Sequence, residues 1–337
     1  MNLISVPTNK PIFVVGSPRS GTSILTWCLG QHSDVFVQEE SNWIGRFALQ
    51  IAVAYGIGTA RGERSQLSAL NVEIEDFFAF FGASINALIL NHRQKLELKI
   101  HQKCTANLTQ PSESKVHAAF RITRLQSDLK GRWVDGTPEY SFYICALRKL
   151  FPDARFIHIV RDVTSVVRSM MNFHRTGGPP LAANEQQAYE RWIRTVRACR
   201  QAELAYGSEI VRRIPYSDLI AKPEAALRSL LTFLDEPYES NCLEPLQTRI
   251  NSSKVPTDFD PSDPQTDPKV VAEAKNLEVE LAGEPAPAAP SPDIADEMEV
   301  EFRARVQHAS RLESDNVRAV QRIAYLEKEL DKLKAHS

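Results

Sequence analysis

Residues 12–23 read Ile-Phe-Val-Val-Gly-Ser-Pro-Arg-Ser-Gly-Thr-Ser, and this stretch decides the fold class. Its four apolar residues stop at a glycine, which is typical of a buried parallel strand. Gly16 and Gly21 permit a tight turn, and a helix is predicted to begin at about Thr22. Such a loop wraps backbone N–H groups around a phosphate at the N-terminus of the helix. The stretch therefore predicts a phosphate-binding strand–loop–helix unit, although a plain Gly/Ser turn that caps a helix is the simpler alternative.

The spacing of the two glycines is that of a Walker A loop, but Thr22 stands where that loop has its lysine. Ser20, Thr22 and Ser23 add hydroxyl donors, and Arg19 adds a fixed positive charge. Without the lysine, the loop is a poor match for the γ-phosphate and Mg²⁺ of a nucleoside triphosphate.

Two more strand–helix units follow along the chain. Residues 155–160 form an apolar run before a helical pattern from Asp162, and residues 209–214 precede a helix expected near Pro223. Alternating strands and helices predict an α/β fold, a parallel sheet with helices on its faces. Residues 44–130 are more helical and irregular, and we interpret them as an insertion near the active site.

A second candidate phosphate motif lies at the end of the run 155–160. Arg161 follows the strand, and Ser169 lies two turns along the next helix. Ligands of open α/β sheets bind at the carboxyl ends of the strands, so Arg161 is well placed to reach one. In the alternative interpretation, Asp162 caps the helix and Arg161 is a surface charge.

The segment Pro18-Arg19-Ser20-Gly21-Thr22 resembles the 5′-phosphosulfate loop of sulfotransferases that use 3′-phosphoadenosine-5′-phosphosulfate (PAPS). An arginine at position 19 resembles the branch with tyrosylprotein, carbohydrate and bacterial sulfotransferases. The resemblance covers roughly residues 11–255 and implies PAPS as co-substrate, 3′,5′-ADP as product and no metal requirement. The residues that it places at the nucleotide are Pro18, Arg19, Ser20, Gly21, Thr22, Ser23, Arg161, Ser169, Tyr216, Ser252 and Ser253.

The same resemblance assigns the catalytic roles to Glu40 and Arg19. Glu40 is the second residue of a Glu-Glu pair, and it corresponds to the general base of the tyrosylprotein branch, although Glu39 stays open as an alternative. Without the resemblance to the family, the sequence alone would indicate that both carboxylates are ordinary surface charges. Two departures are visible: Asn42 replaces an arginine of that branch, and Gly136 replaces a lysine that contacts the sulfonate in many relatives.

The C-terminal third changes character. We predict a sulfotransferase domain over residues 1–255, a Pro/Asp/Ala-rich linker over 256–295 and an amphipathic helix over 296–337. The helix carries a heptad repeat, which predicts a coiled coil and a homo-oligomer, whereas a single helix docked on the domain is the alternative. Its a positions are Phe302, Ala309, Asn316, Ile323 and Leu330, and its d positions are Arg305, Leu312, Ala319, Leu326 and Leu333.

Charge and cysteine content narrow the remaining possibilities. Forty basic residues face 42 acidic ones, so no overall field points to nucleic acid or a membrane surface. The five cysteines have no metal-ligand spacing, the first ten residues do not resemble a signal peptide, and the longest apolar runs fall short of a membrane span. We therefore expect a cytoplasmic protein.

The expected function is transfer of a sulfuryl group from PAPS to an acceptor hydroxyl. The acceptor class stays open among glycan, lipid, small molecule and peptide. His32, His158 and His174 lie near the motifs, but histidines of this kind are more often packing or capping residues. A P-loop kinase or NTPase, and a non-catalytic coiled-coil scaffold that retains the fold, are the two alternatives.

Overall fold

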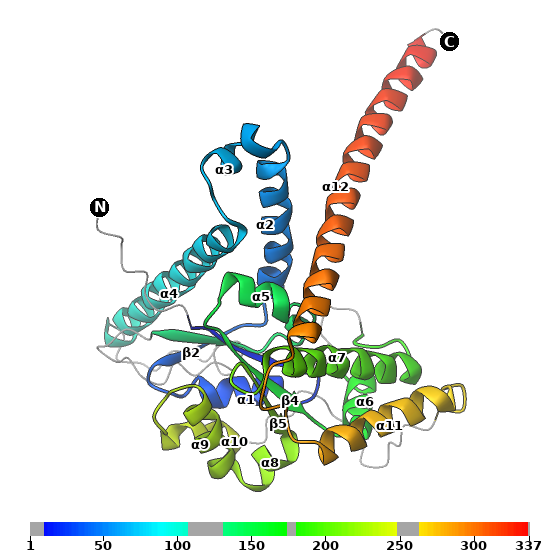
Figure 1. Cartoon of the computed structure of the whole chain (residues 1–337). Helices are drawn as coiled ribbons and strands as arrows, with labels where there is room; N and C mark the ends of the chain where they lie inside the picture. Colours follow the sequence, from blue (N-terminus) through cyan, green and yellow to red (C-terminus); the bar gives the residue numbers. More distant parts are fainter. Residues whose placement is uncertain (1–9, 107–130, 174–179, 248–262, 336–337) are drawn as a thin grey trace.

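The computed structural model describes residues 10–106, 131–173, 180–247 and 263–335 (Figure 1). Within these ranges, five strands form one parallel sheet in the order β2-β3-β1-β4-β5. The strands are β1 (Ile12–Val15), β2 (Val35–Gln38), β3 (Arg132–Asp135), β4 (Arg155–Val160) and β5 (Val211–Pro215). The helices are α1 (Thr22–Leu29), α2 (Trp43–Thr59), η1 (Gly62–Arg64), α3 (Gln66–Ala69), α4 (Ile74–Ala106), η2 (Pro138–Phe142), α5 (Ile144–Leu150), α6 (Val163–Met171), α7 (Glu185–Tyr206), α8 (Tyr216–Ala221), α9 (Pro223–Phe233), η3 (Ser240–Leu243), α10 (Glu244–Gln247), α11 (Pro268–Gly283) and α12 (Pro292–Ala335).

The predicted α/β fold is confirmed. Strands β1 and β4 have the expected bounds, while β5 begins two residues later than expected, at Val211. Helix α6 begins directly after Asp162, whose side chain accepts a hydrogen bond from the Ser165 N–H at 2.8 Å and so caps it.

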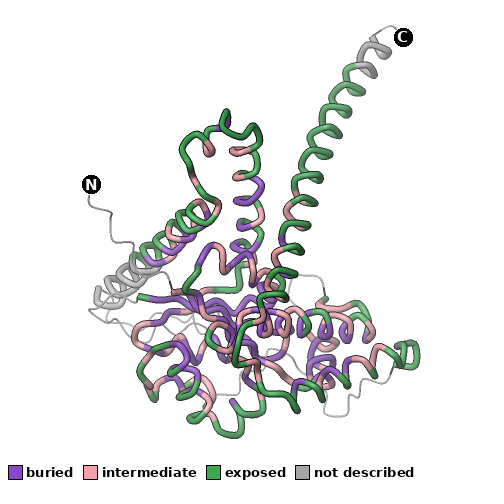
Figure 2. The backbone as a smooth tube through the Cα atoms, in the orientation of Figure 1, coloured by how far each residue is buried: buried purple, intermediate pink, exposed green. Residues whose placement is uncertain are grey.

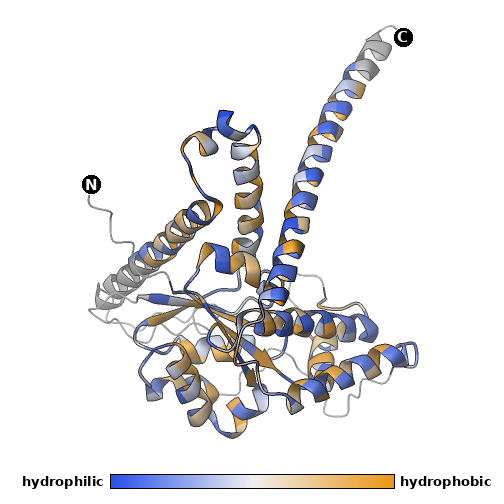
Figure 3. Ribbon diagram, viewed as in Figure 1, coloured by the Kyte–Doolittle hydropathy of each residue, from blue (hydrophilic) through white to orange (hydrophobic). Residues whose placement is uncertain are grey.

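Strand β1 separates two apolar cores because successive side chains point to opposite faces of the sheet. Phe13 and Val15 pack into a cluster with α2, α4, α5 and α7. Ile12 and Val14 pack into a second cluster with α1 and α9. The central strands are buried and apolar, with helices on both faces (Figures 2 and 3).

Residues 44–130 include all but the first residue of α2 and the whole of α3 and α4, which stand out from one face of the sheet (Figure 1). The stretch Ile74–His92 of α4 is long and apolar enough to cross a membrane by length and composition. This corrects the expectation that no run reaches that length. The buried core helices of soluble proteins meet the same criteria, but only 28% of this window is buried, including Phe78 and Ile85 in the core.

The region expected to be a linker contains a packed helix. Helix α11 lies against α6 and α7 and buries Ala274, Leu277 and Leu281. These apolar residues recur at three- and four-residue spacing within a segment rich in charged and small residues, which hid the helical stripe. The linker prediction is therefore wrong for residues 268–283.

Helix α12 is docked on the domain over its first turns, as one of the two alternatives from the sequence predicted. It begins at Pro292, slightly earlier than predicted, and its first turns bury Met298 and Phe302 in the domain core. Beyond them the helix projects away from the domain (Figures 1 and 2), and Leu312 and Ile323 are 56% and 55% exposed. The coiled coil stays a prediction for this projecting part.

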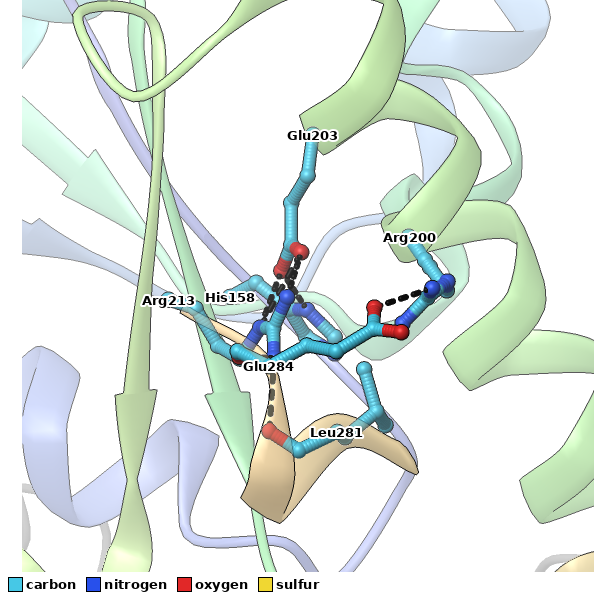
Figure 4. Close-up of polar contacts among 6 residues, drawn as sticks. All are labelled: His158, Arg200, Glu203, Arg213, Leu281 and Glu284. Carbon is cyan, nitrogen blue, oxygen red and sulfur yellow. Dashed lines mark hydrogen bonds and ion pairs between the residues drawn. The ribbon is translucent and has the colours of Figure 1, made fainter. Parts of the chain in front are cut away.

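A buried polar cluster joins the sheet to α7 and α11 (Figure 4). His158 Nδ1 lies 2.5 Å from Glu203 Oε1, and Arg213 also donates to Glu203. Arg213 donates in addition to the carbonyl oxygens of Leu281 and Glu284 at the end of α11. Burial by itself would lower the pKa of His158, but the charges of Cys199 and Glu203 raise it to about 10.

Replacing Glu203 with Gln is expected to destabilise the protein by about 3–5 kcal/mol at pH 7, because His158 and Arg213 lose a buried anion. A histidine with a raised pKa stabilises the fold fully below its unfolded pKa of roughly 6.5. That contribution disappears as the pH rises through about 10. Chemical denaturation at pH 7 and pH 10 tests both statements.

The surface pair of Arg200 with Glu284 provides the control, since Glu284→Gln should lower the free energy of unfolding by less than about 1 kcal/mol. An equal cost for the two variants would contradict this role.

Candidate functional site

The candidate residues come together because each follows a strand of a parallel sheet. The loop from Gly16 follows β1, Glu40 comes two residues after β2, Arg161 follows β4 and Tyr216 follows β5. The carboxyl ends of parallel strands lie at one edge, where ligands of open α/β sheets bind. The sequence motifs are thereby gathered at a single edge of the sheet.

The loop between β1 and α1 uses backbone conformations that its glycines make possible. Gly16 and Gly21 have φ values of 147° and 105°, in the region that favours glycine. A Cβ at Gly21 would lie 2.6 Å from the Tyr216 ring, so the loop also packs closely on the residue after β5. Arg19 adopts φ 72° without being a glycine, and such strain clusters at functional sites.

The loop fits a phosphate group. Among the described residues, the buried Ser20 hydroxyl has no hydrogen-bond partner. Gly21 is the N-cap of α1 and supplies no side-chain cap, so the first N–H groups of the helix face the loop. Pro18 and Thr22 are buried in the loop wall. A phosphate oxygen would satisfy both the hydroxyl and the N–H groups.

The two predicted phosphate motifs are in direct contact. Arg19 Nε donates to Ser169 Oγ at 2.9 Å, across 150 residues of sequence. Arg161 Nη1 donates to the Arg19 carbonyl oxygen at 3.2 Å, and its guanidinium lies 4.8 Å from the centre of the Tyr216 ring. Arg161, Ser169 and Tyr216 thus all contact the loop or its side chains.

Positive charge is concentrated there. Burial lowers the pKa of the Arg19 guanidinium, the Arg161 charge lowers it further, and Glu40 acts in the opposite direction. Two neighbouring guanidinium groups repel each other, so an anion between them is favoured. The Arg19 guanidinium also stacks on Phe173, 4.5 Å from its ring centre, which limits its movement.

Glu40 contacts the loop where helix α1 begins. Its carboxylate accepts a hydrogen bond from the Ser23 hydroxyl at 3.2 Å, at the start of α1. Glu40 is exposed to solvent, so its carboxylate is accessible to another molecule. Glu39 is also exposed, and no hydrogen bond between it and the loop is among the described contacts.

The two departures from the family pattern have visible consequences. A Cβ at Gly136 would lie 2.2 Å from Thr26 Oγ1, so helix α1 occupies the space that a side chain at this position needs. Asn42 has φ 54°, a left-handed conformation that asparagine tolerates, and it begins helix α2. Residue 136 therefore adds no positive charge to the site, and Arg19 and Arg161 are the cations at the loop.

Several site residues were not identified from the sequence. Ser141 Oγ accepts a hydrogen bond from the Gly16 N–H at 3.0 Å and so supports the loop from η2. The buried residues Asp135 and Thr137 form a hydrogen-bond network with the exposed Ser41, next to Glu40 in sequence. Asp135, Thr137 and Ser141 lie in or just after the segment Trp133 to Tyr140. From the sequence, this segment was noted only for the glycine that replaces a lysine at position 136.

Other candidates lie elsewhere or outside the described residues. Ser252, Ser253 and His174 belong to the ranges that are not described. His32 is buried and lies 3.0 Å from the Pro237 carbonyl oxygen, so it has a packing role. Within the described ranges, no cluster of three or more His, Cys, Asp or Glu side chains is arranged to hold a metal ion.

The chain is similar to several known proteins. It is 25% identical over 249 residues to an uncharacterized protein of Aquifex aeolicus (strain VF5), covering 72% of this chain and 28% of that protein. It is 24% identical to a putative protein-tyrosine sulfotransferase of Caenorhabditis briggsae, covering 69% of this chain and 68% of the relative. For protein-tyrosine sulfotransferase 1 of Danio rerio the identity is also 24%, over 69% of this chain and 55% of the relative. The chain thus spans between about a quarter and two thirds of these relatives.

Among solved structures, the sulfotransferase domain from the curacin biosynthetic pathway matches with a TM-score of 0.44 and 18% identity. The match covers 82% of this chain and 98% of that domain. The sulfotransferase domain from the Synechococcus PCC 7002 olefin synthase matches with a TM-score of 0.42 and 18% identity, over 89% and 97%. The family model described as "Sulfotransferase family" matches residues 11–240, which include the loop, Glu40, Arg161 and Tyr216. This chain belongs to the sulfotransferase family.

Proposed function

We propose that this chain is a PAPS-dependent O-sulfotransferase. The observation that carries the proposal is the contact between its two phosphate motifs, in which Arg19 Nε donates to Ser169 Oγ and Arg161 holds the Arg19 carbonyl. A nucleotide with phosphates at both its 5′ and 3′ positions matches two adjacent cationic subsites better than one with a single phosphate chain. Membership of the sulfotransferase family supports the same co-substrate.

In this proposal, PAPS supplies the sulfuryl group and leaves as 3′,5′-ADP. Glu40 takes the proton of the acceptor hydroxyl as its oxygen forms the new bond to sulfur. Arg19 and the N–H groups of the loop stabilise the charge that develops on the 5′-phosphate when its bond to sulfur breaks. Ser23 donates to Glu40 and so holds the base next to that loop.

A kinase or NTPase is less well supported. Asp135 ends the strand next to β1, where such enzymes place a Mg²⁺-binding carboxylate. Its oxygens, however, already accept hydrogen bonds from Thr137 and Ser41. Thr22 also stands where the Walker lysine would be.

Incubating the full chain with cell extract and ³⁴S-labelled PAPS tests the proposed reaction. Mass spectrometry should find acceptor molecules that carry the labelled sulfuryl group, and the Glu40→Gln variant should not form them. Nucleotide turnover that depends on Mg²⁺, without labelled products, would favour the kinase alternative. Binding of 3′,5′-ADP without transfer to any acceptor would favour the scaffold alternative.

We also propose that the chain forms a parallel homodimer through the projecting part of α12. The heptad positions Leu312, Ile323 and Leu326 are about half exposed, with 56%, 55% and 48% of their surface accessible. In a parallel pairing, Arg322 of one helix faces Glu327 of the other, which favours a second copy as the partner.

A cytoplasmic location is proposed as well, and the free thiols of Cys28, Cys145, Cys199 and Cys242 support it.

Light scattering of the full chain is expected to give a dimer, and the double variant Ile323→Glu, Leu326→Glu a monomer, because two buried charges would face each other across the seam. Val317 is 51% exposed on the same helix but lies off the seam, so Val317→Glu should stay dimeric. A chain that ends at His308 lacks the projecting part of α12 and should be monomeric. It keeps Phe302, because the first turns of α12 belong to the domain core. A monomeric full chain would refute this assembly.

A further inference from the structure

A buried carboxylate beside the site has no role in the reaction as described so far. Asp135, at the end of β3, is only 1% exposed. None of the ion pairs among the described residues includes it. A buried carboxylate without a cation is costly for stability, so its retention calls for another explanation. Its position beside the segment that carries Glu40 suggests one.

The hydrogen bonds of Asp135 converge on Ser41, the residue after Glu40. Asp135 Oδ1 accepts from the Thr137 N–H at 2.9 Å and from the Thr137 hydroxyl at 2.6 Å. Thr137 Oγ1 in turn accepts from the Ser41 N–H at 3.0 Å. The Ser41 hydroxyl donates to Asp135 Oδ2 at 3.3 Å and lies 2.9 Å from the Tyr140 hydroxyl. Both hydrogen-bond donors of Ser41, its N–H and its hydroxyl, are therefore held by residues at and after the end of β3.

The network extends to the start of helix α2. The Tyr140 hydroxyl also accepts from the Ile44 N–H at 3.3 Å. The segment that carries Glu40 is thus fixed immediately after the carboxylate and again at the first turn of α2. From the other side, Ser23 donates to the Glu40 carboxylate itself. Two sets of contacts thereby define where this carboxylate lies relative to the phosphate loop.

We propose that Asp135 is a positioning residue that holds Glu40 in place for proton removal, acting through Thr137 and Ser41. The proposal rests on the proposed function for its catalytic consequence, but its structural content concerns the segment 39–44 alone. The ionised carboxylate accepts three hydrogen bonds, and a protonated one must give up an acceptor position to its own proton. The ionised form is therefore the one that fits this network.

The ionisation of Asp135 gives the network a pH dependence. Burial raises the pKa of Asp135 to about 7, against the lowering effect of its hydrogen bonds, and the Glu40 charge raises it further. Glu40 is the charged group that acts on Asp135, whereas the nearby Tyr140 hydroxyl stays neutral in this range because burial and the Asp135 charge raise its pKa. Turnover should therefore fall as the pH drops through about 7. In the Asp135→Asn variant, this decrease on the acidic side of the pH–rate profile should be absent.

Steady-state kinetics on the full chain test the catalytic part. Asp135→Asn is expected to lower kcat on the order of 10²-fold, because a misplaced base is inefficient, while the Kd for 3′,5′-ADP stays within about twofold. In a Glu40→Gln background, the same substitution should lower kcat no further, since it acts through Glu40. A full additional loss in that background would overturn the proposal.

Hydrogen exchange tests the positioning without any acceptor. Thr137→Val keeps the side-chain shape and removes the hydroxyl, whereas Thr137→Ser keeps the hydroxyl and serves as the matched control. Amide exchange in residues 39–44 should be faster in Thr137→Val and unchanged in Thr137→Ser. Equal exchange in the two variants would overturn the proposal. An absence of transfer by the unaltered chain would instead contradict the proposed function.

Discussion

Glu40→Gln is expected to lower turnover by roughly 10²–10⁴-fold, because glutamine keeps the shape of the side chain and cannot accept the acceptor proton. The Ser23 hydroxyl can still donate to the amide oxygen of glutamine, so the loop should remain intact. The affinity for 3′,5′-ADP should therefore stay close to that of the unaltered chain. Steady-state kinetics with a working acceptor and calorimetric titration of 3′,5′-ADP measure the two quantities separately.

Glu39 offers the matched control for this experiment, since it is the neighbouring exposed glutamate. Glu39→Gln should leave turnover nearly unchanged, because the hydrogen bond from Ser23 goes to Glu40. Arg19→Ala should both slow turnover and weaken PAPS binding, because Arg19 belongs to the phosphate loop. Near-normal turnover in Glu40→Gln, or a large loss in Glu39→Gln, would reassign the base.

Arg161→Ala is expected to remove most of the preference for 3′,5′-ADP over ADP. A charge-assisted contact to a phosphate contributes about 1.5–3 kcal/mol, which corresponds to roughly 10–150-fold in affinity. Calorimetry with both nucleotides, without added Mg²⁺, measures the ratio of their dissociation constants. The unaltered chain should bind 3′,5′-ADP far better than ADP, and the variant should approach equal affinities.

Arg228 is a suitable control for a lost arginine, because it forms a surface pair with Glu224 on α9, away from the loop. Arg228→Ala should keep the full preference for 3′,5′-ADP. Arg161 also donates to the Arg19 carbonyl, so thermal unfolding should accompany the titration to confirm that the variant is folded. Equal affinity of the unaltered chain for ADP and 3′,5′-ADP would count against the sulfotransferase reaction itself.

The C-terminal region illustrates where sequence patterns fall short. The heptad over residues 302–333 was visible, but Phe302 at its first a position is buried in the domain core. A heptad identifies an apolar face and says nothing about which surface covers it. The helix α11 was missed for a related reason. Its buried face holds few large apolar residues, and α6 and α7 complete the packing.

The sequence by itself determined the strand–loop–helix unit from Ile12 and the strand that leads to Arg161, and it indicated the residues that we propose for the two phosphate subsites. These features are local, since glycine spacing, apolar runs and caps act within a few residues. Only the tertiary structure decided that Ser141 supports Gly16 and that Asp135 and Thr137 hold Ser41. These contacts join residues up to 125 positions apart, and a serine or aspartate in a loop carries no local mark of its distant partner. Their partners are set by the order of the strands, which brings the ends of β1, β2 and β3 together at one edge.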